Sequence, residues 1–357
     1  MTDRRRYDWV DAAKGISIIL VVMMYSAHNV GKYTGDIGIL HYVIGFATPF
    51  RMPEFFLISG LFLSQVIGRD WLRYGDRRVL HYFYFYALWA AISIVLKVGI
   101  ASGDIGGMLS DLALALVQPY GVLWFIYMLG VFSVVAKLAW QYRVPHWAVI
   151  TASALLQMAQ IEVASYAVTQ FCAYFVFFYI GYAASPLVFR LVEAAVARPA
   201  LATAGLVAWA LAEALLVFLP DGMPEPTAMQ MGYAAFPPLH FALAVLGALA
   251  LCIGSALLIR IRGMGWLRWI GEHSLVIYLA FTLPMSAIRI IAMKTGFTDT
   301  SLLSCMVLVG SILAPVALYL IIQRVGYGRF LFERPAWAHL PGTPGSNNPR
   351  PIPAPAE

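Results

Sequence analysis

The sequence predicts an all-α integral membrane protein, a polytopic helical bundle of about ten spans of the ~20 residues that a bilayer needs. The 357 residues are 61% hydrophobic and only 12% charged, and soluble domains carry about twice that charged fraction. The net charge of +6 does not indicate nucleic-acid binding, because the basic residues lie between the apolar segments, as topology signals do. Lipid is therefore the solvent and the lipid bilayer the first partner that the composition predicts.

The apolar segments justify the span count one by one. In chain order they are 9–30, 42–67, 79–100, 123–140, 145–161, 167–189, 200–219, 238–259, 269–293 and 301–322. The basic N-terminus is not followed by a small-residue cleavage site, so the first segment is interpreted as an uncleaved helix. The fifth segment is the shortest. The stretch "LALALVQPYG" at 112–121 is too short to span and is expected to lie at the interface or to re-enter, with Pro119 ending it.

Lysine and arginine predict the orientation. Of the 24 such residues, 19 fall on the side that holds the N-terminus, the even-numbered loops and the C-terminus, and three fall on the other. The rule that cytoplasmic loops are positive predicts both termini in the cytoplasm and an even number of spans. Residues 1–334 are interpreted as one membrane domain. The proline-rich, polar segment 335–357 is predicted to be a disordered cytoplasmic tail.

The three cysteines, Cys172, Cys252 and Cys305, lie inside apolar segments. They are expected to act as small buried hydrophobes. No metal-ligand spacing and no disulfide framework is present, so no metal site is predicted.

Ionisable residues inside a membrane are costly and are candidates for function. Arg51 and Glu54 share a helix face, three residues apart, and Pro49 and Pro53 make that helix irregular. The pair is either a structural ion pair or the lining of a polar pocket. Two further residues are less informative: Glu213 lacks an evident partner, and Arg289 is close enough to a span end to snorkel to the interface.

The densest basic stretch is "GRDWLRYGDRRVLHYFYFY" at 68–86. It is either a topology signal alone or a site for an anionic ligand, because arginines pair with phosphates bidentately. Arg78 and His81 are three residues apart and point the same way. At the cytoplasmic mouth they suit a phosphate-bearing donor.

The first segment carries three protonatable side chains. Tyr25 lies eleven residues after Lys14, or ~16 Å further along a helix, and His28 lies nearly one turn beyond Tyr25. His28 is either a hydrogen-bonding group at the interface or a catalytic base.

Five stretches together resemble the membrane-bound acyltransferase-3 family. They are "DWVDAAKGISIILVVMMYS", "MPEFFLISGLFLS", "GDRRVLHYF", "GVLWFIYML" and "IGEHSLVIYLAF", in the order and spacing of the family, and the likeness runs from residue 8 to about residue 322. The resemblance implies ten helices around a pore-like site in an integral membrane protein, expected in the bacterial inner membrane. It also implies transfer of an acyl group, acetyl or succinyl in class, from acyl-CoA as co-substrate to a hydroxyl of a carbohydrate or lipid-linked acceptor.

The resemblance also implies site residues, and this sequence departs from the pattern at several of them. The family has an arginine, ten residues and a histidine in its first helix; Lys14 and Tyr25 stand there. His81 follows Arg78 where a second arginine is common, and Phe281 stands where the ninth segment often has a histidine. Lys14, Arg78 and His81 are therefore expected to bind acyl-CoA.

The remaining expectations concern catalysis. Tyrosine, with an ordinary pKa of about 10, is a poor base at neutral pH, but it can hydrogen-bond an acceptor or an oxyanion. His28, three residues on, can supply the base, so His28 and Tyr25 are the predicted catalytic residues. Arg51, Glu54 and Ser59 are predicted to line the pocket. The alternative is a non-catalytic or transport relative on the same scaffold.

Overall fold

The computed structural model describes residues 7–349, apart from the side chain of Met293. It is helical almost throughout, as the sequence predicts, with one two-stranded antiparallel sheet. Among the described residues, seven helices are long and apolar enough to cross a membrane, or eight if one bent pair forms a single span. The chain divides into two compact units.

Unit 1 comprises residues 1–62, 150–161 and 172–318. Its elements are α1 (Asp8–Thr34), α2 (Ile39–Ala47), α3 (Arg51–Leu61), most of α8 (His146–Met158) and of α9 (Tyr166–Ala183), α10 (Ser185–Ala197), α11 (Pro199–Phe218), β1 (Met223–Pro224), β2 (Met229–Gln230), η4 (Tyr233–Ala235), α12 (Pro237–Leu258), α13 (Gly265–Glu272), α14 (Ser274–Ala280), α15 (Thr282–Lys294) and most of α16 (Thr300–Val325).

Unit 2 comprises residues 63–149, 162–171 and 319–357. Its elements are α4 (Trp71–Gly75), η1 (Asp76–Leu80), α5 (His81–Ile94), η2 (Val95–Ile100), α6 (Ile105–Leu114), η3 (Gly121–Leu123), α7 (Trp124–Gln141), η5 (Arg329–Leu331) and η6 (Ala336–Ala338). Helices α4 to η2 run on as one candidate span, 71–100, with η1 and η2 in π-helical geometry.

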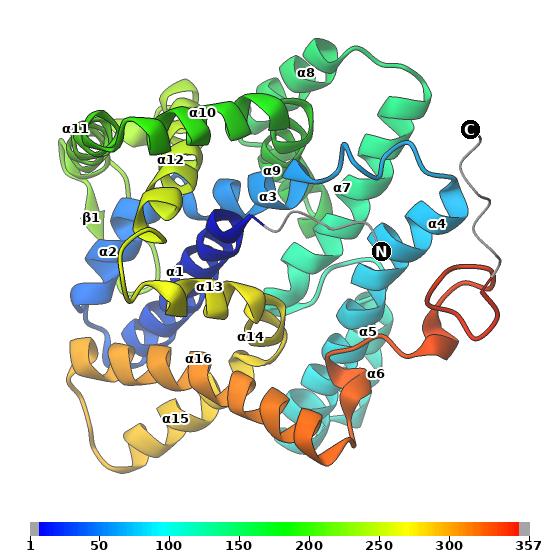
Figure 1. Ribbon diagram of the computed structural model, residues 1–357. Coiled ribbons are helices and arrows are strands. Elements are labelled where there is room, and N and C mark those ends of the chain that lie inside the picture. Colours follow the sequence, from blue (N-terminus) through cyan, green and yellow to red (C-terminus); the bar gives the residue numbers. More distant parts are fainter. Residues whose placement is uncertain (1–6, 350–357) are drawn as a thin grey trace. The chain divides into compact units, whose positions relative to one another are not determined.

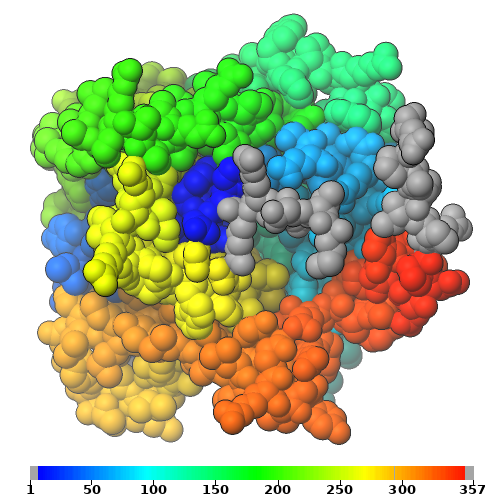
Figure 2. All heavy atoms as spheres, viewed as in Figure 1, coloured from blue at the N-terminus to red at the C-terminus, as the bar shows by residue number. Residues whose placement is uncertain are grey.

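Helix α1 is the central helix of unit 1 and packs against α2, α3, α12, α13 and α14 (Figure 1). Its closest contact is with α13, where glycines let the two backbones meet: Gly15 abuts Leu267, and Gly271 abuts Asp11. Small residues serve this purpose at helix interfaces in membranes. The start of α1, dark blue in Figure 2, reaches the surface between the spheres of α10 and those of α12 and α13. The helix that carries Lys14 and Tyr25 thus lies at the core of its unit.

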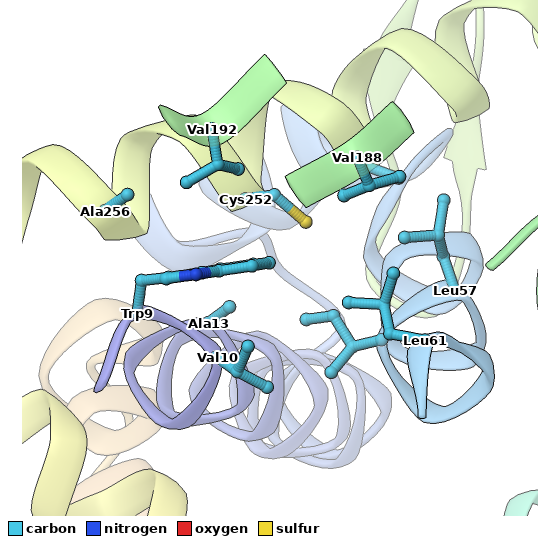
Figure 3. Close-up of a cluster of buried hydrophobic side chains, with 11 residues drawn as sticks. Trp9, Val10, Ala13, Leu57, Leu61, Val188, Val192, Cys252 and Ala256 are labelled. Carbon is cyan, nitrogen blue, oxygen red and sulfur yellow. The ribbon is translucent and has the colours of Figure 1, made fainter. Parts of the chain in front are cut away.

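An apolar cluster beside the start of α1 joins that helix to α3, α10 and α12. Trp9 and Val10 meet Leu57 and Leu61, with Cys252 pointing into the same cluster (Figure 3). Cys252 is fully buried and unpaired, which agrees with its expected role as a small hydrophobe.

Several predicted spans differ from the helices observed. The predicted span 42–67 is broken into α2 and α3, and the span 167–189 ends at Ala183, where α10 begins as a separate helix. The predicted span 269–293 comprises α13, α14 and α15, with a 53° bend between the last two. The fifth, 145–161, is the 13-residue helix α8. The predicted segment 112–121 continues α6 for only three residues and then turns, five residues before Pro119.

The breaks follow from proline and from local polar groups. Pro53 and Pro284 each occupy the third position of a helix, α3 and α15, where a missing backbone N–H removes no helical hydrogen bond. At the end of α2 the carbonyl of Ile44 accepts from the side chains of Thr48 and Arg51. Irregular backbone at membrane depth is tolerated only where protein or a wet cavity satisfies it.

Candidate active site

Tyr25 and Phe281, the two positions where the family resemblance leads us to expect histidines, meet in the structure. Tyr25 of α1 and Phe281, between α14 and α15, have ring centroids 5.5 Å apart at an interplanar angle of 42°. One turn further on, Asn29 of α1 reaches Met285 of α15, with its amide 3.6 Å from the sulfur. Side chains of α1 thus meet Phe281 and Met285 at two successive turns. An aromatic contact occupies the two positions where the resemblance implies histidines.

His28 lies beside this contact with both ring nitrogens free. Its ring faces that of His41 at 6.3 Å between centroids, and it interacts electrostatically with Arg51 and His41. Within residues 7–349 neither ring nitrogen of His28 forms a hydrogen bond. The side chain is half-buried, so both nitrogens remain available to a substrate. A general base requires this kind of lone pair within reach of a substrate hydroxyl.

His41, which sequence reasoning missed, plays a structural part. The backbone amide of Gly38 donates to its Nδ1 at 3.0 Å, and its Nε2 lies 3.3 Å from the carbonyl oxygen of Pro226. Because Nδ1 accepts, the proton is on Nε2, and the imidazole is the neutral tautomer that donates to Pro226. Both nitrogens of His41 are thus occupied, whereas those of His28 are not.

Arg51 stands at the break between α2 and α3. Its Nη1 donates to the carbonyl of Ile44 at 3.3 Å and to the hydroxyl of Thr48 at 3.1 Å, which closes the end of α2. The guanidinium also interacts electrostatically with Tyr25 and Tyr174. These contacts place Arg51 near Tyr25 and His28, and its predicted role in lining a pocket stays a prediction.

Glu54 does not pair with Arg51, so the predicted alternative of a structural ion pair is wrong. Its carboxylate turns to α1, where Oε2 hydrogen-bonds the hydroxyl of Ser17, and the whole side chain is buried. The reason is geometric: Glu54 faces the α1–α3 contact, and Arg51 faces the end of α2. Ser59 lies further along α3 and bonds only the carbonyl of Phe55, at 2.8 Å.

Arg289 reaches the same turn of α1 from α15. Its Nη1 lies 3.5 Å from the side-chain oxygen of Asn29, and Asn29 in turn donates to the carbonyl of Tyr25 at 2.9 Å. The Nε of Arg289 is buried without a partner. These contacts tie Arg289 to α1, and the expected snorkelling to the interface stays a prediction.

Lys14 lies three turns before Tyr25 on α1, and its Nζ lies 3.4 Å from Asp11. About a third of its side chain is exposed. The structure thus places Lys14 away from the cluster at His28.

In unit 2, Arg78 and His81 flank the junction of η1 and α5. The Nη1 of Arg78 lies 3.4 Å from the hydroxyl of Tyr82, which is a weak contact, so most of the guanidinium is available for another ligand. His81 interacts electrostatically with Arg78 and Arg334. Short π-helical stretches such as η1 are frequent at functional sites.

A buried charge network beside this pair was not predicted. Asp76 accepts from Arg334 Nη2 at 2.6 Å, from His339 Nδ1 at 3.0 Å and from the amide of Leu340 at 2.8 Å. The Arg334 and Asp76 side chains are only 2% and 7% exposed. Of the tail predicted to be disordered, residues 335–349 are thus described, and Leu340 and His339 are bound to Asp76. Residues 350–357 lie outside the described residues.

In the part of the chain that the structure describes, no cluster of three or more His, Cys, Asp or Glu side chains is arranged to hold a metal ion.

Comparison with known protein families identifies the chain. The model of the acyltransferase domain that defines the acyltransferase-3 family matches residues 7–320. The chain belongs to the acyltransferase-3 family. The search of curated proteins and the search of solved structures found no match. The match spans α1 to nearly the end of α16 and, with the apolar helices, supports a membrane acyltransferase.

The acyltransferase-3 site in unit 1 combines a free imidazole at His28, a phenol at Tyr25 and a cation at Arg51. A base, a hydrogen-bonding group and a positive charge are the parts that attack of a hydroxyl on a carbonyl requires. Sequence reasoning named these three residues, but it missed His41, Asn29 and Asp76.

Proposed function

We propose that this acyltransferase-3 protein transfers an acyl group of the acetyl or succinyl class from acyl-CoA to a hydroxyl of a carbohydrate or lipid-linked glycoconjugate. The observation that carries the proposal is the imidazole of His28, whose nitrogens bond nothing else in the described residues. It lies beside Tyr25 and Arg51, in the helix that bears the family's first motif.

The proposed reaction is a direct transfer. His28 takes the proton of the acceptor hydroxyl as the hydroxyl oxygen attacks the thioester carbonyl carbon. The negative charge that develops on the carbonyl oxygen is stabilised by the Arg51 guanidinium and by the hydroxyl of Tyr25. The carbon–sulfur bond then breaks, and the coenzyme A sulfur leaves and receives the proton from His28. No covalent enzyme intermediate is required.

Arg78, His81 and Lys14 are proposed to bind the phosphates of acyl-CoA. The support for Arg78 is its guanidinium, which has only the weak contact with Tyr82 in the structure. Arginine matches phosphate bidentately. The support for Lys14 is weaker, because its ammonium group is already beside Asp11.

A specific observation favours a second function, that of a non-catalytic or transport relative. Both family histidine positions are aromatic here, and the two rings pack on each other. If His28 does not act as the base, the scaffold still holds a polar site inside a membrane domain and can bind an acceptor without modifying it.

Thioester turnover by the purified protein separates these functions. Acyl-CoA and a panel of free and lipid-linked sugars are offered, and free thiol and acylated sugar are both measured. An enzyme releases thiol only when an acceptor is present and forms one ester for each thiol. Absence of acceptor-dependent thiol release with every acyl-CoA and acceptor tried would favour the non-catalytic function.

We also propose that both termini lie in the cytoplasm, on the basis of the distribution of lysine and arginine. A reporter fused after Arg334 should then be cytoplasmic, and one inserted at Asp221 should be external. An external reporter after Arg334 would contradict this orientation.

A further inference from the structure

Two arginines near α1 lack a carboxylate partner: Arg51, which acts on His28, and Arg289, which contacts Asn29. Among residues 7–349, neither Arg51 nor Arg289 forms an ion pair, although other basic side chains do so, Arg334 with Asp76 among them. The Nε atoms of both arginines are buried and have no hydrogen-bond partner in the described structure. Charged groups within a membrane domain usually pair with one another. These two cations therefore require an explanation.

The nearest carboxylate along α3 does not compensate Arg51. Glu54 is one turn away but bonds Ser17 of α1. The groups that Arg51 does contact, the Ile44 carbonyl and the Thr48 hydroxyl, are neutral. A buried charge that meets only neutral acceptors keeps much of its desolvation cost.

Arg289 is compensated no better. Its one hydrogen bond, to the Asn29 amide oxygen, is at the 3.5 Å limit, where such bonds are weak. The neighbouring groups on this side, Asn29 and Met285, are also neutral. Arg289 is therefore a second cation on α1, at Asn29, the residue that follows His28 in the sequence.

A site of net positive charge beside a free base selects its ligand by charge. We infer that the acceptor of this acyltransferase-3 protein is anionic, with a carboxylate or a phosphate bound by Arg289 and Arg51 while its hydroxyl reaches His28. That the bound ligand is an acceptor rests on the proposed function. The preference for an anionic ligand does not require catalysis. Carboxylate and phosphate share the chemistry that arginine recognises, a planar array of donors against two oxygens.

Binding without acyl-CoA tests the inference separately from turnover. The purified protein is titrated calorimetrically with methyl glucuronide, glucose 1-phosphate and the neutral methyl glucoside. We expect an acidic probe to bind at least about tenfold more tightly than the neutral one, since hydrogen bonds between two charged groups are stronger than those to a neutral hydroxyl. The glucuronide and the phosphate distinguish an acidic sugar from a phosphate-linked acceptor.

Variants assign the preference to the two arginines. Arg289→Gln and Arg51→Gln should each remove most of the preference for the acidic probe over methyl glucoside. Arg289→Lys, which keeps the charge, should retain part of it. Arg260→Gln is the control, because Arg260 is exposed and bonds the carbonyl of Val196 at 2.8 Å, and it should bind as the parent does.

Several outcomes would overturn the inference. They are equal affinity for acidic and neutral probes, no measurable binding of either acidic probe, or an acidic preference that persists in Arg289→Gln and Arg51→Gln. Acidic preference without any thioester turnover would instead overturn the proposed function and leave this inference standing. Turnover with neutral sugars in preference to acidic ones would do the reverse.

Discussion

Tyr25 and Phe281 contact each other through their rings, 5.5 Å apart between centroids, at the two positions where the resemblance implies histidines. The two departures from the expected pattern are therefore one local feature. Such an aromatic contact is worth about 0.5–1.5 kcal/mol beyond its buried area. Tyr25 is a poor general base at neutral pH. His28, nearly one turn further along α1, has an imidazole that forms no hydrogen bond in the described residues.

Tyr25→His should raise acceptor-dependent thiol release, because it returns an imidazole to the family position. Tyr25→Phe should lower turnover less than His28→Ala does, because it removes one hydroxyl and keeps the ring packed on Phe281. Steady-state rates of the variants, each with its thermal stability recorded, check the order. Abolition of turnover in Tyr25→Phe would make the tyrosine the working group.

Gly271→Ala should destabilise the protein by about 1–3 kcal/mol, the cost of overpacking a tight contact, because an added Cβ would overlap the Asp11 backbone of α1. Gly265→Ala, at the start of the same helix α13, is the matched control, because nothing lies within 4 Å of its Cβ position. Thermal unfolding in detergent measures both. Equal stability of the two variants would mean that α1 and α13 are not packed this closely.

Arg334→Gln should cost about 3–5 kcal/mol, because it leaves the buried Asp76 carboxylate without its ion-pair partner. Arg73→Gln is the control, since Arg73 pairs with an Asp70 that is 55% exposed, and such a surface pair contributes about 0–1 kcal/mol. The double variant Asp76→Asn, Arg334→Gln should lose less than the sum of the two single losses. Additive losses would show that the two side chains do not interact.

Arg78→Ala should weaken acyl-CoA binding, and Arg78→Lys should restore it only in part, because lysine cannot match phosphate bidentately. The neighbouring, exposed Arg77→Ala tests whether general charge is enough. Equilibrium binding of a non-hydrolysable coenzyme A analogue measures the effect. Unchanged affinity in a folded Arg78→Ala protein would remove Arg78 from the donor site.

The fold class could be predicted because membrane helices are specified by long apolar segments. The failures are local. The bend between α14 and α15 and the separation of α9 from α10 depend on short polar or proline-containing turns inside otherwise apolar sequence. Hydropathy averages over such turns, so it merges two helices into one span.

The site could be predicted only where the partners are close in the sequence. His28 and Tyr25 share one helix, and Arg51 is conspicuous as a charge inside an apolar segment. The partner of Glu54 is Ser17, 37 residues away, and that of Asp76 is Arg334, 258 residues away. The sequence around each of these residues does not indicate its distant partner. From the sequence, Arg334 is interpreted as one of the basic residues that set the topology, although its side chain is almost fully buried.

The most direct test of the account is the rate of acceptor-dependent thiol release by His28→Ala, measured beside His146→Ala. His146 is exposed at the start of α8 and serves as the control. We predict that His28→Ala loses ~10²–10⁴-fold in turnover, the contribution of a general base, while its stability and the rate of His146→Ala stay at the level of the parent. A folded His28→Ala protein that releases thiol as fast as the parent would contradict the assignment of His28 as the base.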